Sequence, residues 1–167
     1  MWSLTNDQQQ QLFRLAAAAS VGIVVGLDRH IRHKPAGVRT HGLVCLGSAA
    51  VTLGAIYAFP HANVVQALQG VVSGVGFLGA GLIVHAGQNN TVHGLTTAAS
   101  LWFVASIGAI LGFGNWFISF TATLLGLLVL LFGGTLEKRL ERLERLERGG
   151  RPERESDLSD GAQDDRL

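Results

Sequence analysis

Three glycines in the middle of the chain have the spacing of a dinucleotide-binding motif. The stretch SGVGFLGAG, residues 73–81, places Gly74, Gly76 and Gly79 in the pattern G-x-G-x-x-G. In a dinucleotide fold this pattern follows a strand, opens a helix, and precedes by about 20 residues an acid that binds the ribose. The next acid after Gly79 is Glu137, beyond two further apolar segments. The sequence therefore argues against a dinucleotide enzyme, and the glycines need another role.

A single acid lies in a basic segment that follows the first apolar stretch. The segment reads DRHIRHKPAGVRTH, residues 28–41, and Asp28 is its only acid. This carboxylate either pairs with Arg29, Arg32 or Arg39, or binds a cation or proton, or simply belongs to a charged pair that marks the membrane boundary. One carboxylate among several cations is a poor Mg²⁺ site. The segment is better suited to an anionic group, either a lipid phosphate or an acidic side chain of a partner.

Hydroxyl side chains open a later apolar segment, which begins GLTTAASLW at residue 94. Thr96, Thr97 and Ser100 can cap a helix or form hydrogen bonds across helices. No pair of a base and an orienting group stands near them in the sequence, so nucleophilic catalysis is not supported. We expect no enzyme activity, no cofactor and no metal site.

The histidines and the cysteine lack the spacing of metal ligands. We interpret the lone Cys45 as a small packing residue. The histidines are interpreted as polar loop residues: His30, His33, His41, His61, His85 and His93.

The distribution of charge identifies an integral membrane protein. Only 15% of the 167 residues are charged, against about 25% in soluble domains. From Thr40 through Leu136 there is no Asp, Glu, Lys or Arg. A soluble surface of this size needs charge, whereas a charge inside a bilayer costs a few kcal/mol. The expected partners are membrane lipids and another membrane protein or further copies of this chain, not nucleic acid.

Five apolar segments approach the length of about 20 residues that a bilayer requires. The sequence therefore predicts an all-α, polytopic transmembrane helix bundle with about five spans and a short cytoplasmic C-terminal helix. The predicted spans are 12–27, 41–59, 64–85, 95–113 and 116–132. The predicted domains are a membrane domain over 1–134, an amphipathic helix over 135–149 and a disordered acidic tail over 150–167.

The basic residues predict the orientation. With five spans, the segment 28–41 and the basic segment after the fifth span lie on one side of the membrane, and the positive-inside rule makes that side cytoplasmic. The N-terminus then faces outward, and the C-terminus lies in the cytoplasm.

Glycines four residues apart predict close contacts between helices. Gly70 and Gly74 form one such pair, and Gly22 and Gly26 form another. Small faces of this kind let neighbouring backbones approach in lipid. A different interpretation is that the helix is broken at residues 79–81 and exposes backbone to a polar cavity. The glycines predicted to pack in the third span are Gly70, Gly74, Gly76, Gly79 and Gly81.

Five ordered motifs resemble those of the MgtC/SapB family: GLDR (26–29), KPAGVRTH (34–41), LVCLG (43–47), VSGVGFLGAG (72–81) and GLTTAASLW (94–102). The resemblance implies an inner-membrane protein associated with growth in low magnesium and, in some pathogens, with survival in macrophages. It also implies modulation of the F-type ATP synthase rather than magnesium transport. The family's acid–arginine pair maps onto Asp28 and Arg29, and its basic loop maps onto Lys34, Arg39 and Thr40.

The chain departs from the family pattern in two places. Asn63, Gln66 and Gly70 stand where the family often has an acid, an arginine and a glutamine. The chain also resembles a short form that lacks the C-terminal ACT-like domain of the virulence members. The sequence thus favours a regulatory or interaction protein, and the alternative is a small ion or solute transporter that acts as an oligomer.

Overall fold

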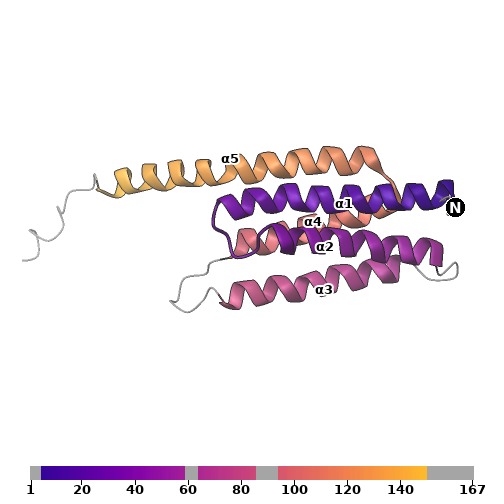
Figure 1. Cartoon of the computed structure of the whole chain (residues 1–167). Helices are drawn as coiled ribbons and strands as arrows, with labels where there is room; N and C mark the ends of the chain where they lie inside the picture. Colours follow the sequence, from indigo (N-terminus) through magenta and orange to yellow (C-terminus); the bar gives the residue numbers. More distant parts are fainter. Residues whose placement is uncertain (1–4, 59–63, 86–93, 150–167) are drawn as a thin grey trace, which may run out of the picture. The chain divides into compact units, whose positions relative to one another are not determined.

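The protein is built from helices joined by short connections. The computed structural model describes residues 5–58, 64–85 and 94–149 (Figure 1), and no strand occurs among them. The elements are α1 (Asn6–Ile31), α2 (Val38–Leu53), the π-helix η1 (Gly54–Ala58), α3 (Val64–His85), α4 (Leu95–Phe113) and α5 (Trp116–Gly149). The predicted all-α fold is confirmed.

Five helices of the described part are long and apolar enough to cross a membrane. The predicted third and fourth spans agree with α3 and α4 at both ends, whereas α1 extends beyond the predicted first span in both directions. Residues 135–149, where the amphipathic helix was predicted, are helical and form the last part of α5. The predicted acidic tail, 150–167, lies outside the described residues.

The chain divides into two compact units at Leu127. The first unit contains α1 to α4 and the first turns of α5, and the remaining residues of α5 belong to the second.

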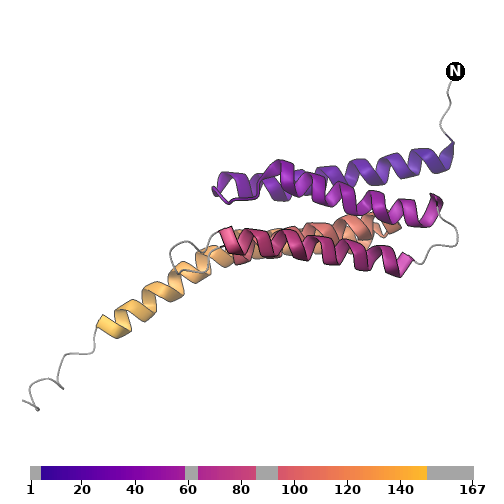
Figure 2. The ribbon, with the colours of Figure 1, turned by 90° about the horizontal axis from the view of Figure 1, so that it is seen from below.

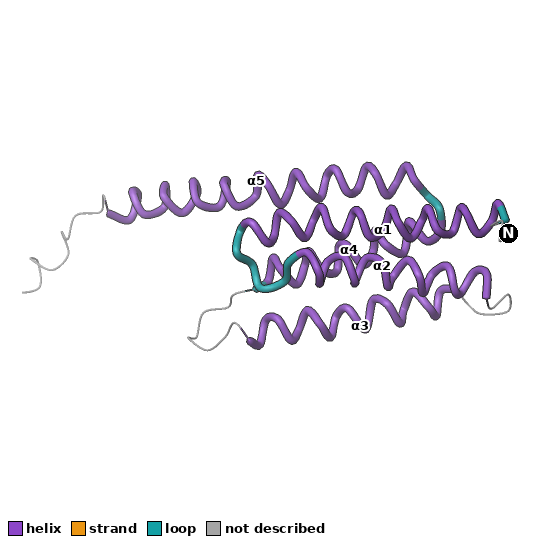
Figure 3. Tube along the Cα trace, viewed as in Figure 1, coloured by secondary structure: helices purple, strands orange, loops and turns teal. Residues whose placement is uncertain are grey.

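Local sequence signals set the ends of two helices. Thr5 caps α1 through a reciprocal pair of bonds: its hydroxyl accepts from the backbone N–H of Gln8, and the Gln8 side chain accepts from the backbone N–H of Thr5. Gly114 ends α4 in a left-handed conformation at φ 81°, which glycine adopts without steric cost. The Asn115 side chain then accepts from the Ile118 N–H at the start of α5. Only Gly114 and Asn115 separate α4 from α5 (Figure 3).

Helix α4 is the centre of the first unit. It contacts α1, α2 and α3, and 56% of its span is buried, compared with 11% for α3. Figure 2 shows α1 and α2 side by side, with α3 running along α4. The fully buried side chains at the centre are mostly small, for example Ala18, Val25, Cys45, Ala49 and Val104. Small side chains permit the close helix packing that stabilises a bundle in lipid.

Glycines mark the closest helix contacts, as predicted for Gly22 and Gly26. A Cβ placed on Gly22 would stand 2.5 Å from the His41 carbonyl oxygen, and one on Gly26 would stand 2.6 Å from the Val38 Cα. Both neighbours are backbone atoms of α2, so neither can move aside. Gly108 and Gly112 of α4, which the sequence analysis did not single out, are equally tightly packed against α2.

The predicted packing role of the α3 glycines is wrong for four of the five within this chain. A Cβ on Gly70, Gly74, Gly76 or Gly81 would meet no atom of another described helix within 4 Å. The physical reason is that α3 turns a different stripe inward, with Val71, Val75 and Leu82 in the core and Gly79 buried. Only Gly79 would contact a neighbour, at 3.4 Å from the Ala98 Cβ.

The alternative interpretation of these glycines, a broken helix at residues 79–81, is also wrong. Helix α3 is continuous from Val64 to His85.

Candidate functional site

A short loop joins α1 to α2 and brings the basic segment against the bundle. Helix α1 ends at Ile31, and the Lys34 N–H returns to the Arg29 carbonyl oxygen at 3.0 Å. His33 takes a positive φ of 55° in this turn. Gly37 then caps α2. Because the chain reverses within six residues, the end of α1 lies beside the start of α2.

Asp28 is ion-paired, and its partner is Arg32. The Asp28 Oδ1 accepts from the Arg32 Nε at 2.8 Å, one helical turn away. The second oxygen, Oδ2, is buried and has no hydrogen-bond partner among the described residues. Of the three arginines considered from the sequence, Arg32 therefore pairs with Asp28, whereas Arg29 and Arg39 form no ion pair with it in the described part of the chain.

Arg29 points into the bundle instead. Its side chain is only 2% exposed, and Nη2 donates to the Thr97 hydroxyl of α4 at 3.3 Å. The Nε–H is buried without a partner among the described residues. A buried guanidinium is costly unless its donors are satisfied, so the contact with Thr97 holds the end of α1 against the start of α4.

The first half of the site is the end of α1 with Asp28 and Arg29, and the second half surrounds His41 of α2. His41 is completely buried, Nδ1 lies 3.0 Å from the Gly37 carbonyl oxygen, and Nε2 lies 3.0 Å from the Ser100 hydroxyl. A carbonyl oxygen only accepts, so Nδ1 carries a proton. The Ser100 hydroxyl has one proton to give, either to Nε2 or to the Thr97 carbonyl oxygen 2.8 Å away.

Thr97 links the two halves of the site. Its hydroxyl accepts from Arg29 of α1, and its carbonyl oxygen lies within hydrogen-bond distance of Ser100, which in turn contacts His41 of α2. One continuous polar network, Arg29–Thr97–Ser100–His41, therefore joins three helices at the end of the bundle where α1 ends and α2 and α4 begin. We call it the buried polar network.

The structure brings together some of the residues predicted from the sequence and leaves others apart. Arg29, Thr97 and Ser100 lie in the buried polar network, and Asp28 is next to it. The other predicted residues are exposed: Lys34, Arg39, Thr40 and Thr96.

His41 was missed as a functional candidate, and its interpretation as a polar loop residue is wrong. It lies in α2, one turn after the Gly37 cap. Its position just inside an apolar span was a signal that it needed a buried partner.

The buried polar network connects α1, α2 and α4 through side-chain hydrogen bonds. His41 and Ser100 are in contact, but no carboxylate of the described residues orients the ring, because its other nitrogen contacts the Gly37 carbonyl oxygen. Among the described residues, no three side chains of the His, Cys, Asp or Glu types lie close enough to hold a metal ion. What the arrangement does is fix three helix ends through buried hydrogen bonds.

These features define a polytopic helical membrane protein with a buried arginine–histidine network at one end of its bundle. A sequence profile of the MgtC family matches residues 15–139, three quarters of the chain. The chain belongs to the MgtC family.

Two named relatives show how far the similarity extends. The chain is 42% identical to protein SrpB of Synechococcus elongatus over 130 residues, which cover 71% of each protein. It is 40% identical to protein MgtC of Salmonella typhimurium over 114 residues, covering 68% of this chain and 48% of that protein. The chain thus spans about half the length of that MgtC protein. No solved structure matches the chain significantly.

Proposed function

We propose that this protein is a non-enzymatic regulator of the bacterial inner membrane that acts by docking on another membrane protein during magnesium limitation. The magnesium connection rests on membership of the MgtC family. The F-type ATP synthase is the partner that the family resemblance implies. The observation that carries the docking proposal is the outer face of α3, which has the composition of a helix interface but is exposed, and a Cβ on its Gly70 would meet no atom within 4 Å.

The outer face of α3 is the stripe formed by Gln66, Gly70, Ser73, Phe77 and Ala80, with further residues at its borders. All five are exposed, and they recur at intervals of three and four residues, which places them on one side of a helix. Two of them carry polar groups at positions within a membrane span. Small and polar residues together are typical of interfaces between transmembrane helices.

The site supports a regulator in a second way. The buried polar network joins α1, α2 and α4, and the carboxylate next to it, that of Asp28, is paired with Arg32. Magnesium sheds its waters reluctantly and is usually bound through carboxylates. The arrangement therefore favours a protein that presents a fixed outer surface.

The experiment is co-purification of the ATP synthase with the affinity-tagged full chain from membranes of cells grown in low magnesium. We expect its membrane-embedded subunits to be enriched with the wild type. We expect Gly70→Leu to abolish this enrichment, since the added side chain blocks close approach of a partner helix. Gly133→Leu is the matched control, because a Cβ there likewise meets no other described helix within 4 Å.

Two results would overturn the proposal. If wild type enriches no ATP synthase subunit over an untagged strain, the partner is wrong. If Gly70→Leu and the further variant Ser73→Leu both retain full enrichment while accumulating normally, the partner does not dock on the outer face of α3. The alternative function, a transporter, was favoured only by a possible break in the third span. Helix α3 has no such break.

A further inference from the structure

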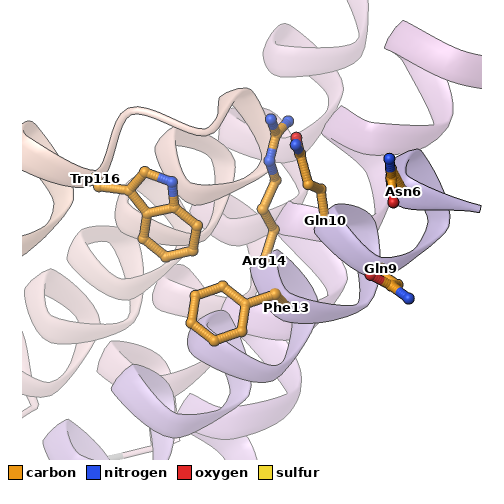
Figure 4. A pocket seen from close by; sticks show the side chains of 6 residues that line it. All are labelled: Asn6, Gln9, Gln10, Phe13, Arg14 and Trp116. Atoms are coloured by element: carbon orange, nitrogen blue, oxygen red, sulfur yellow. The ribbon is translucent and has the colours of Figure 1, made fainter.

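A cavity lies at the opposite end of the bundle from the buried polar network, where α1 begins and α4 turns into α5 (Figure 4). Its volume is about 650 Å³, within the range of about 300–1,000 Å³ that is usual for small-ligand sites. It is lined by Asn6, Gln9, Gln10, Phe13, Arg14 and Trp116. None of these residues takes part in the site described above, so the cavity is independent of it.

Arg14 is the only cation among the lining residues, and the structure fixes its position. Its Nη1 donates to the Gly112 carbonyl oxygen at 3.1 Å, one of the carbonyls at the end of α4 that lack a partner within their own helix. The other guanidinium N–H groups make no hydrogen bond with the described residues and remain available. Figure 4 shows the Arg14 and Gln10 side chains running side by side.

The aromatic wall of the cavity is exposed on the surface of the protein. The rings of Phe13 and Trp116 lie 5.3 Å apart between centroids. Phe13 is 66% exposed and the neighbouring Phe117 is 81% exposed. Exposed phenyl rings beside an indole are typical of the boundary between the hydrocarbon core and the headgroups of a bilayer.

The amides of the cavity lie toward the start of α1, beyond the aromatic rings and Arg14. Phe13 and Arg14 are consecutive in α1, and Arg14 is level with the end of α4. Asn6 begins α1 eight residues earlier than Arg14, about 12 Å further out at 1.5 Å per residue. In a phospholipid a polar headgroup likewise lies beyond the phosphate and the apolar part.

We propose that this cavity binds an anionic phospholipid, with Arg14 holding the phosphodiester. The aromatic pair packs against the glycerol backbone and the upper acyl carbons. The amides of Asn6, Gln9 and Gln10 donate and accept, which suits a headgroup carrying hydroxyls. The lining contains no carboxylate, so it offers no ion pair to the ammonium of a zwitterionic headgroup.

The test is native mass spectrometry of the full chain in detergent, supplied with equal amounts of phosphatidylglycerol and phosphatidylcholine. We expect wild type to retain phosphatidylglycerol preferentially. Arg14→Gln should lower its apparent affinity at least about tenfold, because a charge-assisted hydrogen bond to the phosphate is lost. Arg142→Gln, an equal change of charge at an exposed position of α5, should leave the affinity unchanged.

Trp116→Leu separates lipid binding from folding, because it leaves the Arg14–Gly112 bond in place. We expect it to weaken phosphatidylglycerol binding while the unfolding temperature without lipid stays close to that of wild type. Equal retention of the two lipids, or equal loss in Arg14→Gln and Arg142→Gln, would overturn the proposal. Competition by inorganic phosphate as effective as that by phosphatidylglycerol would also overturn it, since the occupant would then be a soluble anion.

Discussion

His41 of α2 and Ser100 of α4 meet in the buried centre of the protein, with Nε2 and Oγ 3.0 Å apart although the residues are 59 positions apart in the sequence. Both residues are almost completely inaccessible. A buried ring nitrogen needs a partner, and the Ser100 hydroxyl is within hydrogen-bond distance of Nε2. The contact therefore fixes the register of α2 against α4.

We expect Ser100→Ala to lower the free energy of unfolding by about 0.5–2 kcal/mol. The Nε2 atom of His41 would then be buried without a partner, and hydrogen bonds between helices in membrane proteins have measured values in this range. The control is Ser106→Ala, because that exposed hydroxyl bonds only within its own helix, to Trp102. Thermal unfolding in detergent measures both. Equal stability of the two variants would contradict the role given to the His41–Ser100 contact.

Two adjacent threonines of α4, one buried and one exposed, test how the Arg29 side chain is held. Thr97→Val keeps the shape of the side chain but removes the acceptor of Arg29, so it leaves a buried charge with one partner fewer. We expect a loss of about 1.5–3 kcal/mol, the usual value for hydrogen bonds to charged groups. Thr96→Val changes an exposed residue in the same turn and should be tolerated. The measurement is the amount of each protein in membranes together with its unfolding temperature, and a reversed order would show that Arg29 is held by other contacts.

Glycine substitutions distinguish the faces that pack within the chain from those that do not. A Cβ on Gly112 would stand 2.7 Å from the Thr52 Cβ and 2.9 Å from the Ala49 carbonyl oxygen. We expect Gly112→Ala to destabilise the bundle by about 1–3 kcal/mol, as overpacking does. Gly74→Ala, which meets no other described helix, should leave stability unchanged or slightly raised through its helix propensity. Unfolding in detergent tests the pair, and similar losses for both would mean that α3 packs through Gly74.

The sequence predicted the spans well and the inward faces poorly, for one physical reason. Length and apolar composition define a span, and α3 and α4 begin and end where the sequence predicted. In a bilayer, however, apolar residues cover both the core side and the lipid side, so hydropathy does not reveal which face packs. Gly22 and Gly108 lie at contacts whereas Gly70 lies at none, although each is a small residue in an apolar helix.

The residues of the candidate site that the sequence predicted best are the charged ones. Asp28 and Arg29 stand out in an apolar chain, and the structure places both at the polar end of the bundle. His41 was not recognised because a single sequence does not reveal that its ring meets Ser100 in a distant helix. The sequence also does not show that Asp28 pairs with Arg32 rather than with the adjacent Arg29, because it does not reveal that Arg29 is the buried one.

The orientation of the protein is testable with reporter fusions. Basic residues at the α1–α2 loop and in the second half of α5 predict that both lie in the cytoplasm. Fusions after Gly134 and within residues 88–90 should report cytoplasm, and a fusion within residues 60–63 should report the outside. A periplasmic signal from either of the first two would reverse the predicted topology.

We expect the protein alone to transport no magnesium. The only acid between Asp7 and Glu137 is Asp28, and its carboxylate is bonded to Arg32 with the Arg29 side chain buried beside it. A cation entering this position meets repulsion that amounts to several kcal/mol for close pairs at an effective dielectric constant of about 20. Proteoliposomes that contain only the purified protein and a magnesium-sensitive dye inside should show the same uptake as empty liposomes.

Substitutions of Asp28 test whether its carboxylate binds magnesium or only holds Arg32. Asp28→Ala removes the partner of Arg32, so we expect it to impair regulation by loosening the α1–α2 loop, while Asp28→Glu keeps the charge and is largely tolerated. Neither variant should change magnesium flux, since wild type has none. Uptake by wild type that disappears in Asp28→Ala and persists in Asp28→Glu would show instead that the carboxylate binds the ion, and the protein would then be a transporter rather than a regulator.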